Sequence, residues 1–366
     1  MYYFSYAIPV VAMLVALCFG YNSEKWVTYL LVTALAEGVI ALMFYFFSRA
    51  EEYLSGYVVS VVHLNAWTEK VVKTVSTRDS QGHYQTTYEV RYVEHPDQWY
   101  WYLNTDYQQT ISKSLFYEMC RRWGTGLQYF NTNYSNCVSG GGGEECYWNG
   151  CELDTRTVTY KHKYKNPVRY SNSLFKGSFI NKTQARELGL FDYPSVSPFE
   201  DQVVILCDNN LPKPLHYEYA NAELQRLNAF MGAKHEIHVF ILLFQAEKGR
   251  ETALKQRDYW KGLNKNEFVI CLGVCNQKVK WCEALSWMDR PDLSLKTRDY
   301  FVKHEDLDLL NFVKWLRNHL NIWKRKEFKD FEYLGTNMSK GKGLFYWIVS
   351  IILGIIVFLV CINAGT

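Results

Sequence analysis

Residues 257–287 read RDYWKGLNKNEFVICLGVCNQKVKWCEALSW, and their pattern decides the fold of the second half of the chain. A helix is expected to end at Gly262, because glycine readily adopts the left-handed conformation that terminates helices. An apolar strand follows at 268–274, and the turn CNQK leads into a second strand at 279–287. The polar loop GLNKNE is either a site or a connector between helix and strand. Its asparagines can hydrogen-bond turn backbone without a ligand, so we predict a connector.

Upstream of this stretch the chain alternates between strand and helix patterns. The segment 237–244, IHVFILLF, is apolar at every position but its histidine, which is typical of a central strand covered on both faces. The other predicted elements are a strand at 202–208 and helices at 219–232, 249–261 and 306–323. The order β-α-β-α-β-β-α predicts an α/β sandwich over residues 196–323, in which helices cover a mixed sheet.

The order of these elements resembles the TPM domain, a family of small α/β domains that are usually tethered to membranes. The resemblance covers residues 202–290, and it is carried by LNAFMGAKHEIHVFILLF, DYWKGLNKNEFVICLGV and VKWCEALSW. Some members are proposed to be acid phosphatases or to bind calcium through clustered aspartates. The turn before the strand reads Asn264-Lys265-Asn266 here and lacks the acidic residue that is common there. Because Ca²⁺ takes about six to eight oxygen ligands, metal-dependent activity is not expected from this chain.

Three apolar segments surround the soluble part. Residues 6–21 and 26–48 are separated only by a short polar turn, and residues 344–364 contain no charge. About twenty apolar residues suffice to cross a bilayer as a helix. A cleaved signal peptide is the alternative for the first segment, but its opening MYYFSY has no basic residue. We therefore predict a transmembrane helical hairpin at 2–48 and a third transmembrane helix at 344–364.

Basic residues give a weak asymmetry across the predicted membrane. Arg49, Lys340 and Lys342 flank the soluble side, whereas Lys25 lies on the other side. The excess of basic residues predicts a cytoplasmic soluble part, with an extracytoplasmic one as the alternative. Residues 324–343 mix basic and aromatic side chains, which suits a segment in contact with lipid headgroups.

One carboxylate interrupts the second apolar segment. Glu37 lies beside Gly38, and Ala34 and Ala36 are nearby, so small residues are expected to allow a close helix contact there. The contact is either with another helix of this chain or with a second membrane protein, because an intramembrane carboxylate usually faces protein or water.

Residues 49–195 are expected to form a β-rich region. Valine, threonine and tyrosine dominate three predicted strands, 57–64, 69–76 and 84–93, and the last two flank a hairpin loop. A short helix at 110–123 is expected to end at Gly124. The Gly-rich stretch 131–150 is predicted to be a loop. A further strand begins at 156, with Val158, Tyr160 and His162 on one face.

The ten cysteines do not indicate whether the soluble part lies in an oxidising or a reducing compartment. Cys137, Cys146 and Cys151 surround the Gly-rich stretch, and a pair of them is expected to form a disulfide only if the soluble part is extracytoplasmic. A zinc site built on these three would need Cys120 or His162 as its fourth ligand, and the spacing matches no usual pattern. We predict no metal and no cofactor.

Polar residues after the first α/β strand are the best candidates for a site, since ligands gather at the carboxyl ends of such strands. Candidate binding residues are Asp208, Asn209, Asn210, Asn264 and Asn266. Asp208 and Glu283 are the candidate catalytic carboxylates. Glu283 shares a strand face with Trp281 and Leu285, and burial there would raise its pKa unless a partner holds it.

The composition excludes several functions. A net charge of +3 gives no electrostatic basis for binding nucleic acid. The chain has no phosphate-binding Gly loop and no HExxH, GxSxG or CxxC motif. We predict an α+β membrane protein that acts as a non-enzymatic accessory and binds another membrane or membrane-associated protein. The alternative is a membrane-bound hydrolase, similar to a phosphatase, that acts through Asp208 and its neighbours.

Overall fold

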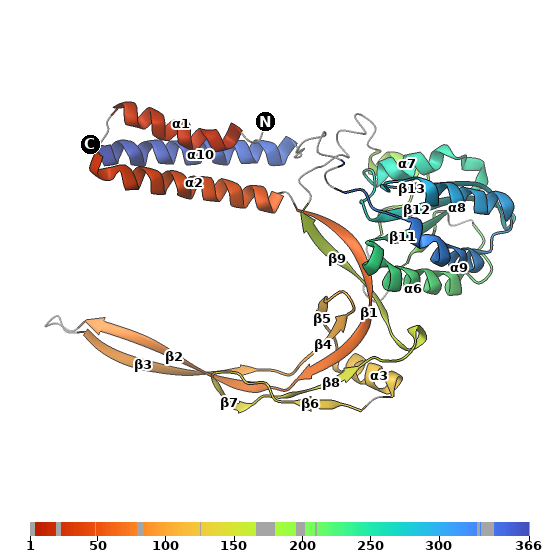
Figure 1. Ribbon diagram of the computed structural model, residues 1–366, viewed down its shortest axis with the longest axis horizontal. Helices are drawn as coiled ribbons and strands as arrows, with labels where there is room; N and C mark the ends of the chain where they lie inside the picture. Colours follow the sequence, from red (N-terminus) through yellow and green to blue (C-terminus); the bar gives the residue numbers. More distant parts are fainter. Residues whose placement is uncertain are drawn as a thin grey trace.

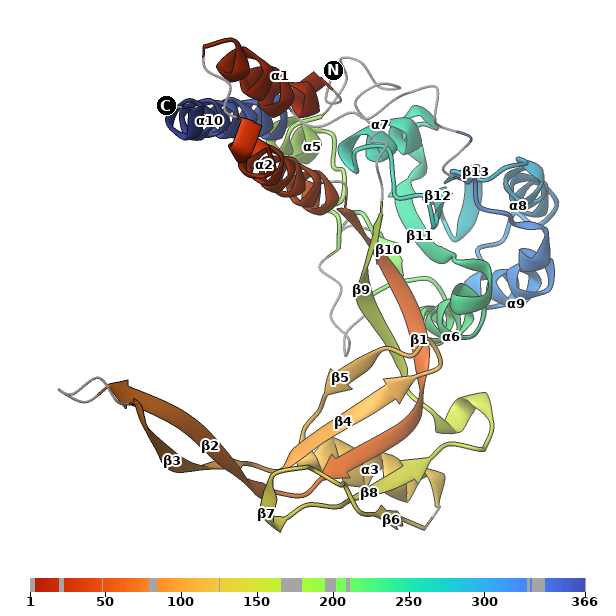
Figure 2. The same cartoon turned by 60° about the vertical axis from the view of Figure 1, so that its left-hand side comes forward.

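The computed structural model describes residues 4–19, 23–47, 49–78, 84–124, 126–165, 180–194, 202–208, 211–327, 330 and 340–365. Figures 1 and 2 show three parts, namely a bundle of three apolar helices, a β-rich region and an α/β domain. The long strand β1 (Arg49–Leu64) follows the second helix and joins all three parts. The chain is therefore a mixed α+β protein, as predicted.

The helix bundle consists of α1 (Phe4–Phe19), α2 (Trp26–Phe47) and α10 (Lys340–Gly365), with a short 3-10 helix, η1 (Ser23–Lys25), before α2. Residues 26–43 and 344–363 are long and apolar enough to cross a membrane, whereas the apolar part of α1 is shorter. α10 packs closely on α1 at Gly354, where a Cβ would lie 2.7 Å from Ile8 Cγ2. The described residues therefore contain two candidate spans and a third, shorter apolar helix that packs against them.

The β-rich region is built on a six-stranded sheet with the order β5-β4-β1-β8-β6, and β9 also pairs with β1. Its other strands are β2 (Trp67–Arg78), β3 (Tyr84–His95), β4 (Gln98–Leu103), β5 (Gln108–Thr110), β6 (Gln128–Phe130), β7 (Cys137–Gly140), β8 (Gly143–Tyr147) and β9 (Thr157–Lys165). The helix α3 (Lys113–Trp123) packs on this sheet through Phe116 and Met119, and it ends at Gly124 in the left-handed conformation, as predicted. A 3-10 helix, η2 (Glu152–Asp154), precedes β9.

The two halves of strand β1 pair with different strands. Its first half pairs antiparallel with β9 from Arg49 to Tyr57, and its second half pairs with β4 and β8. We call the paired segments 49–57 and 157–165 the stem. The stem carries the chain from α2 past the α/β domain to the sheet of the β-rich region (Figure 2).

The prediction of a loop at 131–150 was wrong, because this stretch contains β7 and the buried strand β8. The glycines in this stretch allow a tight turn and a close contact between strands. Gly140, Gly141 and Gly142 have positive φ angles and form the turn between the two strands. A Cβ on Gly143 would lie 2.5 Å from the carbonyl of His63, so only glycine lets β8 approach β1 this closely.

The α/β domain has a four-stranded sheet in the order β10-β11-β12-β13. The first two neighbouring pairs are parallel and the last is antiparallel, so the predicted mixed sheet is confirmed. Its elements are β10 (Val204–Leu206), α6 (Tyr217–His235), β11 (His238–Gln245), η3 (Ala246–Lys248), α7 (Glu251–Tyr259), β12 (Glu267–Cys275), β13 (Lys278–Ser286), α8 (Asp292–Lys303), α9 (Leu309–His319) and η4 (Leu320–Ile322). The short helix α5 (Lys182–Glu187) precedes it. Every residue of β11 except Gln245 is buried, as expected for a central strand.

Helix α8 was not predicted, and the helix expected at 306–323 begins later, at Leu309, because Asp308 caps it through the Asn311 N–H. The stem packs against α6, where Tyr57 stacks on Phe230 with ring centroids 4.1 Å apart. The β-rich region and the α/β domain therefore share a packed interface along the stem.

Candidate functional site: a buried polar junction

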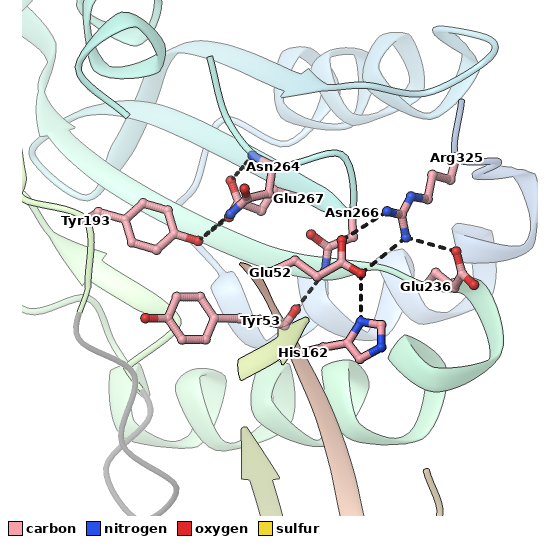
Figure 3. Close-up of polar contacts among 9 residues, drawn as sticks. All are labelled: Glu52, Tyr53, His162, Tyr193, Glu236, Asn264, Asn266, Glu267 and Arg325. Carbon is pink, nitrogen blue, oxygen red and sulfur yellow. Dashed lines mark hydrogen bonds and ion pairs between the residues drawn. The ribbon is translucent and has the colours of Figure 1, made fainter. Parts of the chain in front are cut away.

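A group of charged side chains lies where the stem meets the α/β domain (Figure 3). The group consists of Glu52, His162, Glu236, Lys265 and Arg325, and we call it the polar junction. Glu52 follows α2 by only a few residues, and Arg325 lies between α9 and α10. The junction therefore connects the two places where the chain leaves and approaches the helix bundle.

Strand periodicity places the first two members of the junction. Side chains on a strand alternate between its faces, so Glu51 is exposed while Glu52 is 2% exposed. Glu52 lies opposite His162 in the β1–β9 register, and His162 Nδ1 is 3.2 Å from Glu52 Oε1. The buried carboxylate thus has its first partner on the neighbouring strand.

Arg325 contacts both oxygens of the Glu52 carboxylate. Nη2 lies 3.0 Å from Oε2 and Nη1 lies 3.4 Å from Oε1, while Nη1 also contacts Glu236 at 2.9 Å. This two-pronged arrangement suits the planar guanidinium and fixes its orientation. Because Arg325 is 15% exposed and Glu52 2%, the pair is shielded from water, whereas Glu236 is 65% exposed at the rim.

Burial controls the ionisation of the junction. It raises the pKa of Glu52, while Arg325 and His162 oppose that rise. Lys265 is 0% exposed, and its burial together with nearby Arg325 lowers its pKa to about 7, against the opposing effect of Glu52. The charge of the junction therefore changes in the neutral pH range, through Lys265.

A second group of buried polar side chains lies beside the junction. The Tyr193 hydroxyl donates to Glu267 Oε1, and Asn264 donates from its backbone N–H and its side chain to the two Glu267 oxygens at 2.8 and 2.7 Å. Glu267 is 0% exposed, and burial raises its pKa. Tyr193 stacks on Tyr53 of the stem, with ring centroids 5.6 Å apart (Figure 3).

The loop GLNKNE acts as a connector between two parts of the fold. Asn264 is bonded to Tyr193 and Glu267, and the Asn266 side chain donates to the Tyr53 carbonyl at 2.7 Å. Lys265, Asn266 and Glu267 are fully buried. The loop was predicted to link a helix to a strand, and it also joins the α/β domain to the stem.

The predicted site residues do not form one cluster. Asp208 follows β10 at the opposite end of the sheet from Asn264 and Asn266, and it pairs with Lys248 at 3.6 Å. Asn209 and Asn210 lie outside the described residues. Glu283 is 8% exposed and is held by two arginines, which corresponds to the partnered alternative.

The cysteines near the Gly-rich stretch are dispersed. Cys146 is buried against Cys120 of α3, whereas Cys137 lies on β7 and Cys151 is exposed beside Asp154. All ten cysteines are free thiols. Within the residues that the structure describes, no group of three or more histidine, cysteine, aspartate or glutamate side chains is arranged to hold a metal ion.

In the helix bundle, Gly38 contacts no other described helix of this chain, and the alternative contact with a second membrane protein stays a prediction. Gly38 is exposed, and a Cβ added there would meet nothing within 4 Å. α2 instead packs through Tyr29, Thr33 and Ala36, which are buried and follow helical spacing on the neighbouring face. Glu37 lies next to this face and is partly buried.

Most residues of the polar junction were not predicted from the sequence. Glu52 and Arg325 are 273 positions apart, and only the stem register and the path of the chain after α9 bring them together. The alternation of side chains along the strand did indicate the position of His162. It was expected on the same face as Val158 and Tyr160, and both of those residues are buried.

The junction is suited to holding parts of the fold together. Glu52 is covered and bonded on both oxygens, so no substrate can reach it without displacing Arg325. No protein-family model, curated protein or solved structure matches this chain. The resemblance to the TPM domain therefore stays a prediction.

Proposed function

We propose that this chain is an integral membrane protein that binds another membrane or membrane-associated protein and has no catalytic activity of its own. The helix bundle supports the membrane anchor. Large apolar side chains point out of the bundle along α2 and α10, including Leu31, Leu35, Ile352 and Ile355, each about half exposed or more. Such a surface is unfavourable in water and suits lipid. By its count of basic flanking residues, the soluble part faces the cytoplasm.

All three helices are proposed to cross the bilayer. At 1.5 Å per residue, the 16 residues of α1 reach about 24 Å, somewhat less than a hydrocarbon core of about 30 Å. α1 packs along α10, and modest local thinning or flanking aromatic residues accommodate such a mismatch.

The position of the helices has a consequence for the soluble part. In Figures 1 and 2 the hairpin of β2 and β3 extends on the same side of β1 as the helix bundle. A bilayer around the helices would meet this hairpin. The proposed insertion therefore requires the β-rich region to turn relative to the helices.

The main support for the proposed interaction is the exposure of the hairpin formed by β2 and β3. It projects from the body (Figure 1), and β7 pairs with β2 only from Trp67 to Glu69. The Lys70 N–H still donates to the Asn136 carbonyl at 2.9 Å, and beyond Lys70 the described part of β2 pairs only with β3. A two-stranded hairpin without further cover is marginally stable in water, so it is expected to gain stability from a partner.

One face of the hairpin, which also carries Lys70 and Thr74, has uncovered apolar side chains. Val72 and Val90 are paired across the strands, and Tyr88 and Tyr92 lie on the same face. Their exposed fractions are 50%, 45%, 70% and 59%. Exposed tyrosines within an apolar patch are typical of the centre of a protein interface. We therefore assign this face, defined by these four residues, as the partner-binding face.

Replacing both Tyr88 and Tyr92 with serine is expected to weaken partner capture by at least about tenfold, since truncating a single hot-spot tyrosine costs about 2 kcal/mol and about 1.4 kcal/mol corresponds to tenfold. The measurement is crosslinking and affinity capture of the full-length chain from native membranes. The matched control replaces Glu89 and Arg91, which lie on the opposite face of the same strand, with serine. Equal capture by both double variants, or no discrete partner with the unaltered chain, would refute the proposed surface.

A further inference from the structure

A cavity of about 220 Å³ lies at the outer edge of the α/β sheet, between the edge strand β13, α8 and the start of α7. Its lining includes Arg250, Lys280, Trp281, Cys282, Arg298 and Phe301. Cavities that hold drug-sized ligands measure about 300–1,000 Å³, so this one suits a small ligand.

The two arginines are held in place by the carboxylate of Glu283. Arg298 Nη2 lies 2.5 Å from Glu283 Oε2, and Arg250 Nε lies 3.4 Å from Oε1. Glu283 is 8% exposed, whereas the side chains of Arg298 and Arg250 are 39% and 63% exposed, so the carboxylate is buried and both guanidinium groups reach the surface. Each guanidinium therefore uses one nitrogen to contact Glu283 and keeps other N–H groups for a ligand.

One of those remaining donors is already buried. Arg298 Nε is inaccessible to solvent and has no hydrogen-bond acceptor among the described residues. A buried donor without an acceptor is costly, and a ligand that drew the guanidinium into the cavity and accepted from Nε would relieve this cost.

The charge around the cavity favours a doubly charged anion. Arg250, Lys280 and Arg298 supply three positive charges and Glu283 one negative charge, while the lining residue Glu305 and its partner Lys278, at 4.0 Å, cancel each other. The net positive charge of two matches a phosphate monoester dianion better than a single carboxylate. Guanidinium groups also fit the oxygens of a phosphoryl group in pairs.

The cavity also lies where ligands gather in folds of this kind. Arg250 comes just after β11 and η3, and the Trp281 indole N–H donates at 3.0 Å to the carbonyl of Ala246, the first residue of η3. This is the side of the sheet at which its parallel strands end, the usual ligand side of open α/β sheets.

We propose that this cavity binds a phosphate monoester, with Arg250 and Arg298 bonding the phosphoryl oxygens and Lys280 adding the third cation. The proposal concerns binding alone, and no covalent bond of the ligand is broken. The site is separate from the partner-binding face of the hairpin, so its test is independent of the proposed interaction.

The test titrates the full-length protein, in detergent free of phospholipid, with glycerol phosphate and follows binding by calorimetry. Glycerol is the uncharged control ligand. A parallel arm uses nanodiscs that contain phosphatidic acid, compared with phosphatidylcholine, to distinguish a soluble ester from a lipid headgroup. The variants are Arg298→Gln and Arg250→Gln, and the control is Arg290→Gln, an exposed arginine outside the cavity.

Saturable binding of glycerol phosphate, at least about tenfold weaker in both variants and unchanged in the control, would support a soluble ester. Binding with the same pattern only in phosphatidic acid nanodiscs would assign the phosphoryl group to a lipid. Arg250 is 63% exposed, so its replacement tests the site even if Arg298→Gln impairs folding. No saturable binding in either arm, or equal affinity in all variants, would overturn the proposal.

Discussion

Replacing Arg325 with methionine is expected to lower the free energy of unfolding by about 3–5 kcal/mol, because it leaves the carboxylate of Glu52 buried without its main counter-ion. Glu52 is 2% exposed, and Arg325 contacts both of its oxygens. Removing one member of a buried pair costs far more than removing an exposed pair. The loss should shrink as the pH falls, since a protonated Glu52 needs no counter-ion and burial already raises its pKa.

Urea unfolding of the detergent-solubilised full-length protein, followed by tryptophan fluorescence, measures this effect. The matched control is Arg317→Met, which breaks an ion pair of similar length with Glu152, at 2.9 Å. Both side chains of that pair are more than one third exposed, so its loss should cost less than about 1 kcal/mol. Equal losses in the two variants would show that the polar junction does not hold the fold together. Combining Arg325→Met with Glu52→Gln should recover part of the stability.

Acidification is expected to destabilise the protein through His238. This residue is 0% exposed, its Nδ1 lies 3.3 Å from the Ser55 hydroxyl of the stem, and burial lowers its pKa to about 3 from an ordinary 6.5. Between these two pH values the unfolded state binds one proton more than the folded state. The titration of His238 therefore makes the folded protein more stable as pH rises through this window. As pH falls below about 6.5, this effect lowers the free energy of unfolding by up to about 1.4 kcal/mol per pH unit.

The substitution His238→Asn keeps a polar group near the Ser55 hydroxyl and removes the imidazole that titrates. Glu52 and Glu267 act in the opposite direction, because their pKa values are raised in the folded state and their protonation favours folding as pH falls. The informative quantity is therefore the difference between the two proteins, measured by urea unfolding between pH 7 and about pH 4.5. The stability of the asparagine variant should fall less steeply on acidification. Parallel curves for the two proteins would contradict this assignment.

Elements with a strong local pattern could be predicted from the sequence. The strand β11 is apolar along almost its whole length, and α3 has both helical spacing and a glycine at its end. Helix α8 has a weaker pattern, because charged residues separate its buried Leu293 and Phe301. The strand β8 was hidden by glycines that are typical of loops, and only its pairing with β1 explains why they are there.

The polar junction could not be predicted, because it depends on register and on the path of the chain. Glu52 is buried only because β1 pairs with β9 on the stem, and Arg325 reaches it from the end of the α/β domain. Neighbouring Glu51 has the same chemistry and is exposed. The role of GLNKNE as a connector was predictable, since glycine and asparagine suit a turn, but its contact with Tyr53 was not.

Membrane insertion of the helix bundle is the claim on which the proposed function depends. Alkaline carbonate extraction of membranes from cells that express the full-length chain, followed by ultracentrifugation, tests it most directly. The account predicts that the protein stays in the pellet and is released only by detergent. Recovery of the intact, folded chain in the carbonate supernatant would contradict it.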